Sequence, residues 1–267
     1  MKAYYSLFKM RLIKGLQYRA AALAGVGTQF FWGFMYIMIY EAFYKSTSAN
    51  QPISFHQLIQ VLWLQQSFLV CVMLWFRDNE LIDLITSGNI AYELCRPSDL
   101  YSFWYAKLIA QRLSSAILRC FPIIFIAALL PSPYNFTLPN SLLTFILFLI
   151  ALVLGLILVV AISMLIYISI FYTMSPTGSL LIFSVFGDFF SGLVLPVPLM
   201  PEALKKIVYL LPFRYTADLP FRIYAGNIGV KEALLSIVAQ LFWILLIITL
   251  GKLWINKALK KVVIQGG

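Results

Sequence analysis

A run of 68 residues without a charged side chain, from Cys120 to Gly187, constrains this chain more than any other feature. Soluble domains carry roughly 25% charged residues, because these residues cover their surfaces. Here charged residues make up 11% of the chain and hydrophobic residues 62%. A soluble domain of 267 residues cannot bury that much apolar surface. The sequence therefore excludes an ordinary soluble enzyme or nucleic-acid-binding domain, and nucleic acid is not an expected partner. It predicts an all-α integral membrane protein with lipid around it.

Six segments are read as membrane-spanning helices, because a bilayer core about 30 Å thick needs roughly 20 apolar residues. Breaks at Pro131–Asn135 and Ser175–Gly178 divide the uncharged run. The predicted spans are residues 20–44, 57–76, 105–130, 141–172, 178–195 and 233–251 of one permease domain, 1–267. The fourth span would reach about 48 Å, so we expect it to tilt, to kink near Gly155 or to protrude into the cytoplasm.

The basic residues predict the orientation. With both termini in the cytoplasm, 14 of the 20 Lys and Arg residues fall inside and 6 outside. Cytoplasmic segments carry such an excess, and the net charge of +10 suits an anionic leaflet.

Residues 1–19 are predicted to form an amphipathic helix that lies in the cytoplasmic interface. Tyr5, Phe8, Leu12 and Leu16 fall on one helical face, with basic residues around it. The alternative is a positively charged flank with no role of its own.

Residues 78–100 hold five of the ten acidic residues. Leu81, Leu84 and Ile85 occur at the spacing of one helical face. An acidic patch with apolar side chains suits docking to a soluble partner, whereas the alternative is a solvated loop. A loop of this length with its own periodicity favours the first interpretation.

Residues 196–232 contain five prolines between helix-length apolar fragments. We expect them to fold back into the outer leaflet as a re-entrant helical hairpin, since irregular backbone at that depth must be buried in protein or line a cavity. Leu195, Pro196 and Val197 are the candidate outer gate.

Four residues within the predicted spans are candidates for a substrate path or a helix contact: Gln65, Gln66, Asp188 and Phe189. Asp188 is expected near the middle of the fifth span, where an ionisable group is costly and faces a cavity or a partner. It is equally well explained as a neutral, hydrogen-bonded acid that joins two helices. Gly187 and Gly192 would let another helix approach closely.

No catalytic or metal-binding motif is found. The chain has no GxxxxGK[ST] phosphate loop, no HExxH, no GxSxG and no metal-ligand cluster. The one histidine, His56, starts the second span and is read as an interfacial side chain. The chain is therefore expected to be no enzyme and to hold no cofactor or metal.

Two motifs resemble the permease subunits of bacterial ABC-2-type exporters. Residues 87–97 read SGNIAYELCRP, which is similar to that family's cytoplasmic segment after the second span. Residues 211–215 read LPFRY and are followed by Pro220 and Tyr224-Ala225-Gly226, which is similar to its outer segment. The order of spans, loop and hairpin fits the same pattern, although the pattern does not explain Asp188.

This resemblance implies the fold of the ABCG-type exporters, in a bacterial plasma (inner) membrane. A second permease subunit, identical or not, would face this one, and separate ATP-binding subunits would carry ATP and Mg²⁺. Residues 78–100 would be the coupling helix, with apolar side chains in a groove of the ATPase and charged ones paired around it. The residues in that role would be Glu80, Leu81, Asp83, Leu84, Ile85, Glu93 and Arg96.

The substrate is expected to be amphipathic or hydrophobic: a drug, peptide, lipid or glycolipid. The rival function is an ion- or proton-coupled secondary transporter that uses Asp188 as its coupling acid. Such transporters show internal repeats, and this sequence contains none.

Overall fold

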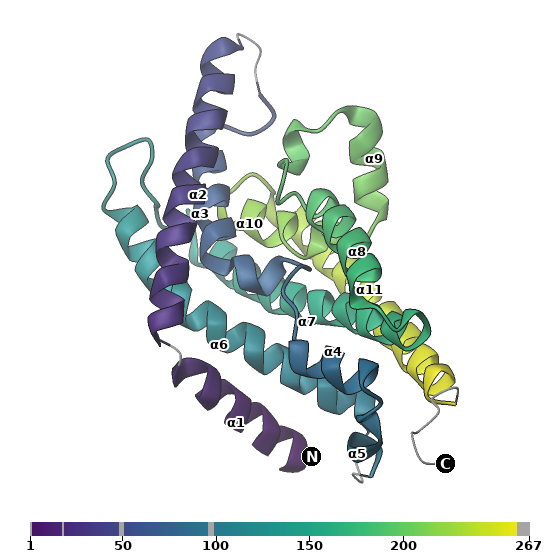
Figure 1. Cartoon of the computed structure of the whole chain (residues 1–267). Helices are drawn as coiled ribbons and strands as arrows, with labels where there is room; N and C mark the ends of the chain where they lie inside the picture. The colour runs from purple at the N-terminus through teal and green to yellow at the C-terminus, as the bar shows by residue number, and fades with distance from the viewer. Residues whose placement is uncertain (1, 18, 48–50, 96–98, 261–267) are drawn as a thin grey trace.

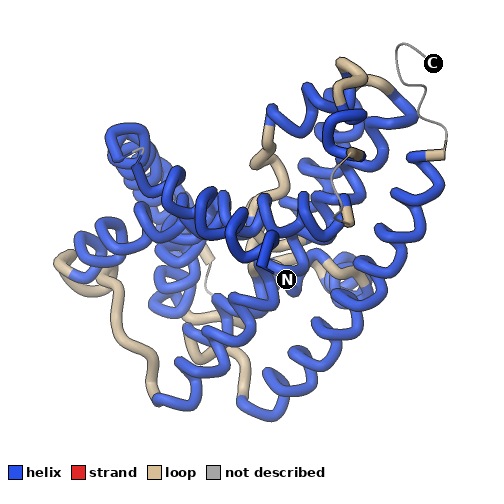
Figure 2. The backbone as a smooth tube through the Cα atoms, turned by 90° about the horizontal axis from the view of Figure 1, so that it is seen from below, coloured by secondary structure: helices blue, strands red, loops and turns tan. Residues whose placement is uncertain are grey.

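Eleven α-helices and two short 3₁₀ helices form the described part of this computed structural model, residues 2–17, 19–47, 51–95 and 99–260. The chain is 80% helical, with no strand among those residues, as Figure 2 shows from below. The all-helical prediction is therefore confirmed.

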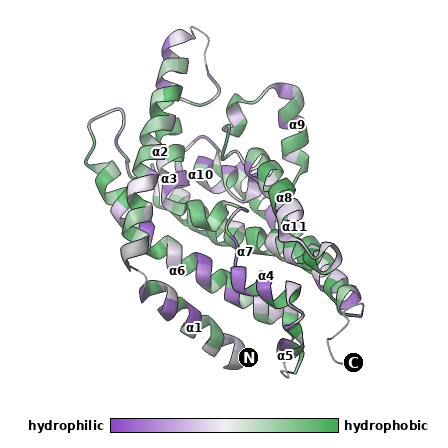
Figure 3. Cartoon of the chain, in the orientation of Figure 1, coloured by the Kyte–Doolittle hydropathy of each residue, from purple (hydrophilic) through white to green (hydrophobic). Residues whose placement is uncertain are grey.

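Four helices are long and apolar enough to cross a membrane. They are α2 (Arg19–Ser46, apolar from Ala22), α6 (Leu100–Ala128), α7 (Leu142–Thr173) and α11 (Val230–Leu259). These four helices are compatible with a multi-pass membrane protein. In Figure 3 the ribbons of α7 and α11 are mostly coloured as hydrophobic, whereas the short helix α4 (Asn79–Thr86) begins with hydrophilic residues.

The second and fifth predicted spans correspond to shorter helices. α3 (Phe55–Val72) carries four glutamines and is kinked at Phe68. α8 (Pro176–Phe190) has 15 residues, about 22 Å, against a bilayer core of about 30 Å. The chain leaves the helix after α8 because Gly192 takes a left-handed backbone conformation, with φ +85°.

α7 is the central helix of the fold. In its most apolar stretch 61% of the residues are buried, against 28–33% in the other three long helices. It packs against α11, α10 (Asp218–Tyr224), α8, α6, α4 and α3. The kink considered near Gly155 is absent, because α7 runs unbroken to Thr173. Gly155 instead lets the backbone carbonyl of Thr216 approach closely, at a place where a Cβ would lie 2.9 Å from it.

Side-chain caps fix where several helices begin. Ser54 and Gln57 form a capping box at the start of α3. Asp78, Asp99 and Ser141 accept backbone N–H bonds at the starts of α4, α6 and α7. The two aspartates that precede α4 and α6 therefore define the ends of the cytoplasmic loop predicted at 78–100.

Most of the segment predicted as an interfacial helix is helical: α1 (Lys2–Gln17) packs along α6. The loop at 78–100 contains α4 and α5 (Ile90–Leu94). In Figure 1, α1, α4 and α5 lie together at the bottom of the molecule.

The proline-rich segment before α11 is folded, with α9 (Glu202–Leu210) mostly exposed and the residues around α10 buried. It contains two 3₁₀ helices, Val197–Leu199 and Phe213–Tyr215, and the helices α9 and α10. All seven residues of α10 are buried, mainly against α7 and α3. The segment is thus helical, as predicted, and α9 lies at the upper end of the molecule in Figure 1.

Candidate functional site

A pocket of about 240 Å³ lies between α2, α3 and α8. It brings together three of the four residues that the sequence singled out, Gln65, Gln66 and Asp188, from two helices that are far apart in the chain. Phe189 does not line it and packs edge-on against Phe190. The remaining lining residues are Trp32, Tyr36, Leu69, Met73, Leu193 and Val194.

The two glutamines differ in their hydrogen bonding. The Gln65 amide Nε2 donates to the Gly192 carbonyl at 3.0 Å, which ties α3 to the turn after α8. The Gln66 Oε1 atom is buried and has no hydrogen-bond partner among the described residues. Such an acceptor costs free energy unless a ligand or partner satisfies it. Gln66 is therefore the side chain best placed to bind a substrate donor.

Asp188 lies in the last turn of α8, because the helix ends at Phe190. Its Oδ1 accepts the backbone N–H of Leu74 at 3.0 Å. A carboxylate at a helix C-terminus is disfavoured by the helix dipole, and this bond offsets that cost. Gly187 permits the contact, because a Cβ there would collide with the Leu74 side chain. The glycine thus admits a connecting segment and not a second helix.

Arg112 of α6 holds the same connecting segment from the other side. The side chain is fully buried, and its guanidinium donates to the carbonyls of Val70, Met73 and Phe76 at 2.8, 2.8 and 3.1 Å. A fourth bond, of 3.1 Å, reaches the Ser163 hydroxyl of α7. A buried guanidinium is tolerated only when such acceptors replace water. The sequence analysis did not single out Arg112; the available signal was a charge inside the predicted span 105–130.

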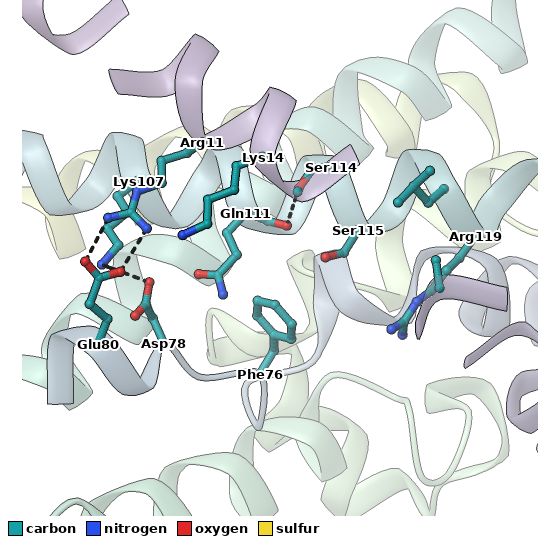
Figure 4. A pocket seen from close by; sticks show the side chains of 13 residues that line it. Arg11, Lys14, Phe76, Asp78, Glu80, Lys107, Gln111, Ser114, Ser115 and Arg119 are labelled. Carbon is teal, nitrogen blue, oxygen red and sulfur yellow. Dashed lines mark hydrogen bonds and ion pairs between the residues drawn. The ribbon is translucent and has the colours of Figure 1, made fainter. Parts of the chain in front are cut away.

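The other end of the connecting segment is fixed by an ionic cluster at α4. Lys107 of α6 lies 3.2 Å from Asp78 and 2.9 Å from Glu80, and Arg11 of α1 makes two bonds to Glu80, at 2.8 and 2.9 Å (Figure 4). The Asp78 N–H donates to the Tyr167 hydroxyl of α7 at 2.7 Å. The Arg11 hydrogen bonds, helped by Lys107, lower the pKa of Glu80 from 4.5 to about 2. Residues 73–78 therefore form a short link with both ends held.

The prediction that Leu81 and Ile85 project toward a partner is wrong. Both side chains are buried inside this chain, where α4 packs on α7, and Leu84 is half-buried against the same core. An amphipathic helix buries its apolar face on the nearest apolar surface, and here that surface is intramolecular. Glu80 likewise has its cationic partners within the chain.

The exposed side of the α4–α5 segment carries other residues. Asp83 is exposed, and Tyr92 and Leu94 of α5 are 74% and 40% exposed. Glu93 is half-buried, and Arg96 lies outside the described residues. Tyr92 and Leu94 were not among the predicted residues, because the five-residue helix α5 is too short to show an apolar periodicity.

The candidate gate residues lie apart from the pocket. Val197 is fully buried in a small apolar cluster with Met200 and Val208, and Leu195 packs against that cluster. Pro196 is buried as well. The pocket wall after α8 is formed instead by Leu193 and Val194, just before the predicted gate residues.

Among the described residues no group of three His, Cys, Asp or Glu side chains could hold a metal ion. No protein-family model matches this chain, and no curated protein matches it either. The pocket, the held link and the exposed α5 surface are thus the features from which function must be inferred.

Proposed function

We propose that this chain crosses a plasma membrane six times, with both termini in the cytoplasm, and is the permease subunit of an ATP-driven ABC exporter. Two permease subunits would face each other, and separate ATP-binding subunits would supply ATP and Mg²⁺ from below. This chain would do no chemistry itself. It would form the substrate path and move when the ATPases push on α4 and α5.

An ion pair supports the crossing by α3. Arg11 precedes α2 in the chain and Glu80 follows α3, yet the two side chains are bonded at 2.8 Å. Charged segments that touch outside the bilayer lie on one side of it, so the number of crossings between them is even. Because α2 is long enough to cross, α3 crosses with it.

A second contact supports the crossing by α8 in the same way. The Tyr224 hydroxyl, after α8, donates to the Thr137 carbonyl, before α7, at 3.0 Å. α7 is long enough to cross, so α8 returns the chain to the same side. Residues 191–195 would complete this short span.

The held link at residues 73–78 is the observation that carries the proposal. Arg112 and Asp188 fix it at the pocket, and Lys107 and Tyr167 fix Asp78 at α4. A push on α4 would therefore reach the pocket through a link that side chains of α6, α7 and α8 hold in place, and not through an unrestrained loop. Conformational coupling of two sites requires such a connected element.

The pocket suits part of an amphipathic substrate. Trp32 and Tyr36 offer aromatic surface, and Gln66 offers an unsatisfied acceptor. Its volume of about 240 Å³ is below the roughly 300–1,000 Å³ of usual ligand sites, as expected if a second subunit supplies the other half.

Co-purification tests the proposal. The tagged chain is purified from its native membranes in mild detergent, and ATP hydrolysis is measured. We expect an ATPase to co-purify with wild type and to be lost in Tyr92→Asp. The matched control is Leu138→Asp, an exposed residue of the α6–α7 loop that should leave the complex intact. An oligomer free of ATPase in the wild type would contradict the proposal.

The alternative is an ion- or proton-coupled secondary transporter, which the position of Asp188 in the pocket favours. In that case Asp188 would release and take up a proton during transport. The Asp188→Asn variant, described in the Discussion, separates the two functions.

A further inference from the structure

A second cavity, of about 420 Å³, lies between α1, the start of α2, α4 and α6, at the end of the molecule that carries α4 and α5 (Figure 4). One face of α6 forms its long wall, from Lys107 through Gln111 and Ser115 to Arg119, and Phe76 lies opposite. The proposed function uses only the ionic end of this cavity, where Lys107 holds Asp78.

The charges in the cavity are unevenly balanced. At one end Arg11 and Lys107 are paired with Asp78 and Glu80. The remaining cations, Lys14 and Arg119, have no carboxylate partner among the described residues. The cavity therefore holds two more positive than negative side chains within that part of the chain.

Arg119 is placed to bind an anion. Its Nε is buried and has no hydrogen-bond partner among the described residues, so a donor is left unsatisfied. Gly25 of α2 makes room for its guanidinium, because a Cβ there would lie 2.9 Å from Cζ. Ser115 lines the wall one turn before it, and Gln111 lies a further turn along α6, beside Lys14 (Figure 4). A guanidinium with a nearby hydroxyl donor matches the oxygen atoms of a phosphate group.

The surroundings of Arg119 favour a lipid as the source of that phosphate. Leu118 of α6 and Ala22 of α2 line the cavity, and Leu23, next to Ala22 in the chain, is 65% exposed. Acyl chains can cover such side chains, whereas a free phosphate cannot. Basic pockets between membrane helices on the cytoplasmic side bind anionic headgroups.

We propose that this cavity binds an anionic lipid headgroup, with Arg119 and Ser115 contacting its phosphate and with Lys14 and Gln111, farther along the cavity, contacting the rest of the headgroup. The lipid would fill the space between α1 and α6 and join α1 to the core. This site is independent of ATP and of any protein partner, so its test can fail without the exporter proposal failing.

The test is a lipid titration of the delipidated chain in neutral detergent, followed by native mass spectrometry. The probes are phosphatidylglycerol and phosphatidylcholine of equal chain length. We expect wild type to prefer phosphatidylglycerol, and Arg119→Gln and Lys14→Gln each to weaken its binding about tenfold, the usual effect of removing a charge-assisted hydrogen bond. The matched control, Lys257→Gln, removes an exposed cation on α11 and should leave binding unchanged.

Ser115→Ala keeps the test valid if Arg119→Gln does not fold, because it removes a donor without burying an unpaired group. Inorganic phosphate is titrated in parallel to identify the source. If the chain binds inorganic phosphate but does not prefer phosphatidylglycerol, the site binds a soluble anion, and the proposal of a lipid ligand is overturned. Equal binding of the two lipids would contradict an anion site in this cavity. An equal loss of phosphatidylglycerol binding in Lys257→Gln and Arg119→Gln would contradict it as well.

Discussion

Single hydrogen bonds hold the link at residues 73–78, through which the proposed function would carry movement of α4 to the pocket. Asp188 accepts the backbone N–H of Leu74. Arg112 donates to two carbonyls of the link, those of Met73 and Phe76, and to the Val70 carbonyl in the last turn of α3. None of these bonds involves an opposite charge. Both residues therefore act here as hydrogen-bonding groups that replace water around unpaired backbone.

Replacing Asp188 separates its structural role from a titrating one. In Asp188→Asn the amide oxygen still accepts the Leu74 N–H, so thermal stability and coupled transport should stay near wild type. In Asp188→Ala that N–H loses its partner, which should cost about 1–3 kcal/mol of unfolding free energy. Thermal unfolding in detergent measures both. A transport rate with a strongly shifted pH dependence in Asp188→Asn would instead favour the secondary transporter.

The pH dependence of the α1–α4 contact follows from Glu80. Because Arg11 and Lys107 lower its pKa from 4.5 to about 2, the contact contributes fully above pH 4.5 and is lost as the pH falls toward 2. Hydrogen exchange of α1, compared between wild type and Glu80→Gln at each pH, should show protection in wild type that shrinks below pH 4.5. The control is Glu202→Gln, which removes an exposed pair on α9. A difference between wild type and Glu80→Gln that is constant from pH 7 to pH 3 would rule this out.

Among the elements, α4 and α5 divide their work. The apolar side of α4 packs on α7 and anchors the segment, while α5 presents Tyr92 and Leu94 outward. A coupling element needs both an anchor and a free surface. Because α4 is packed and α5 is exposed, the segment can be stable without a partner protein and still present a surface to which a partner could bind.

Substitutions in α4 and α5 should therefore differ in kind. Ile85→Ala removes a buried side chain and should cost about 2–5 kcal/mol of local stability. Tyr92→Ala changes an exposed side chain and should change stability by no more than about 0.5 kcal/mol. Denaturant unfolding of the purified chain checks both. Equal destabilisation by the two variants would mean that the Tyr92 side chain is packed against the chain, contrary to the structure.

The sequence predicted the helices well and the contacts between them less well. Apolar length and breakers such as Ser175-Pro176 placed most helices correctly, because these are local properties. The apolar periodicity of α4 correctly predicted an amphipathic helix, but such a periodicity does not show whether the apolar face packs within the chain or on a partner. The Arg112 bonds join residues 36–51 positions apart, and nothing in the local sequence indicates such partners.

For the whole molecule, two contacts support the topology that we propose and that helix length leaves open. The ion pair of Arg11 with Glu80 and the bond of Tyr224 to Thr137 each require an even number of crossings between their partners. The six crossings that we propose, with α1, α4 and α5 on the cytoplasmic side, would satisfy both contacts.

Cysteine accessibility tests this topology. In a chain with Cys95→Ser, a membrane-impermeant maleimide should label Leu138→Cys in intact cells, and should label Asn89→Cys only after permeabilisation. Both positions are exposed. A chain with only the four longest helices crossing would give the reverse labelling.

The most direct test of the exporter account uses Cys95, an exposed native thiol beside α5. The other two cysteines, Cys71 and Cys120, are buried, so a thiol-reactive photo-crosslinker in native membranes should react at Cys95. We predict that light joins this chain to a protein that carries a GxxxxGK[ST] phosphate loop, and that Cys95→Ser abolishes the product. Crosslinks to lipid or to copies of this chain alone would contradict the account.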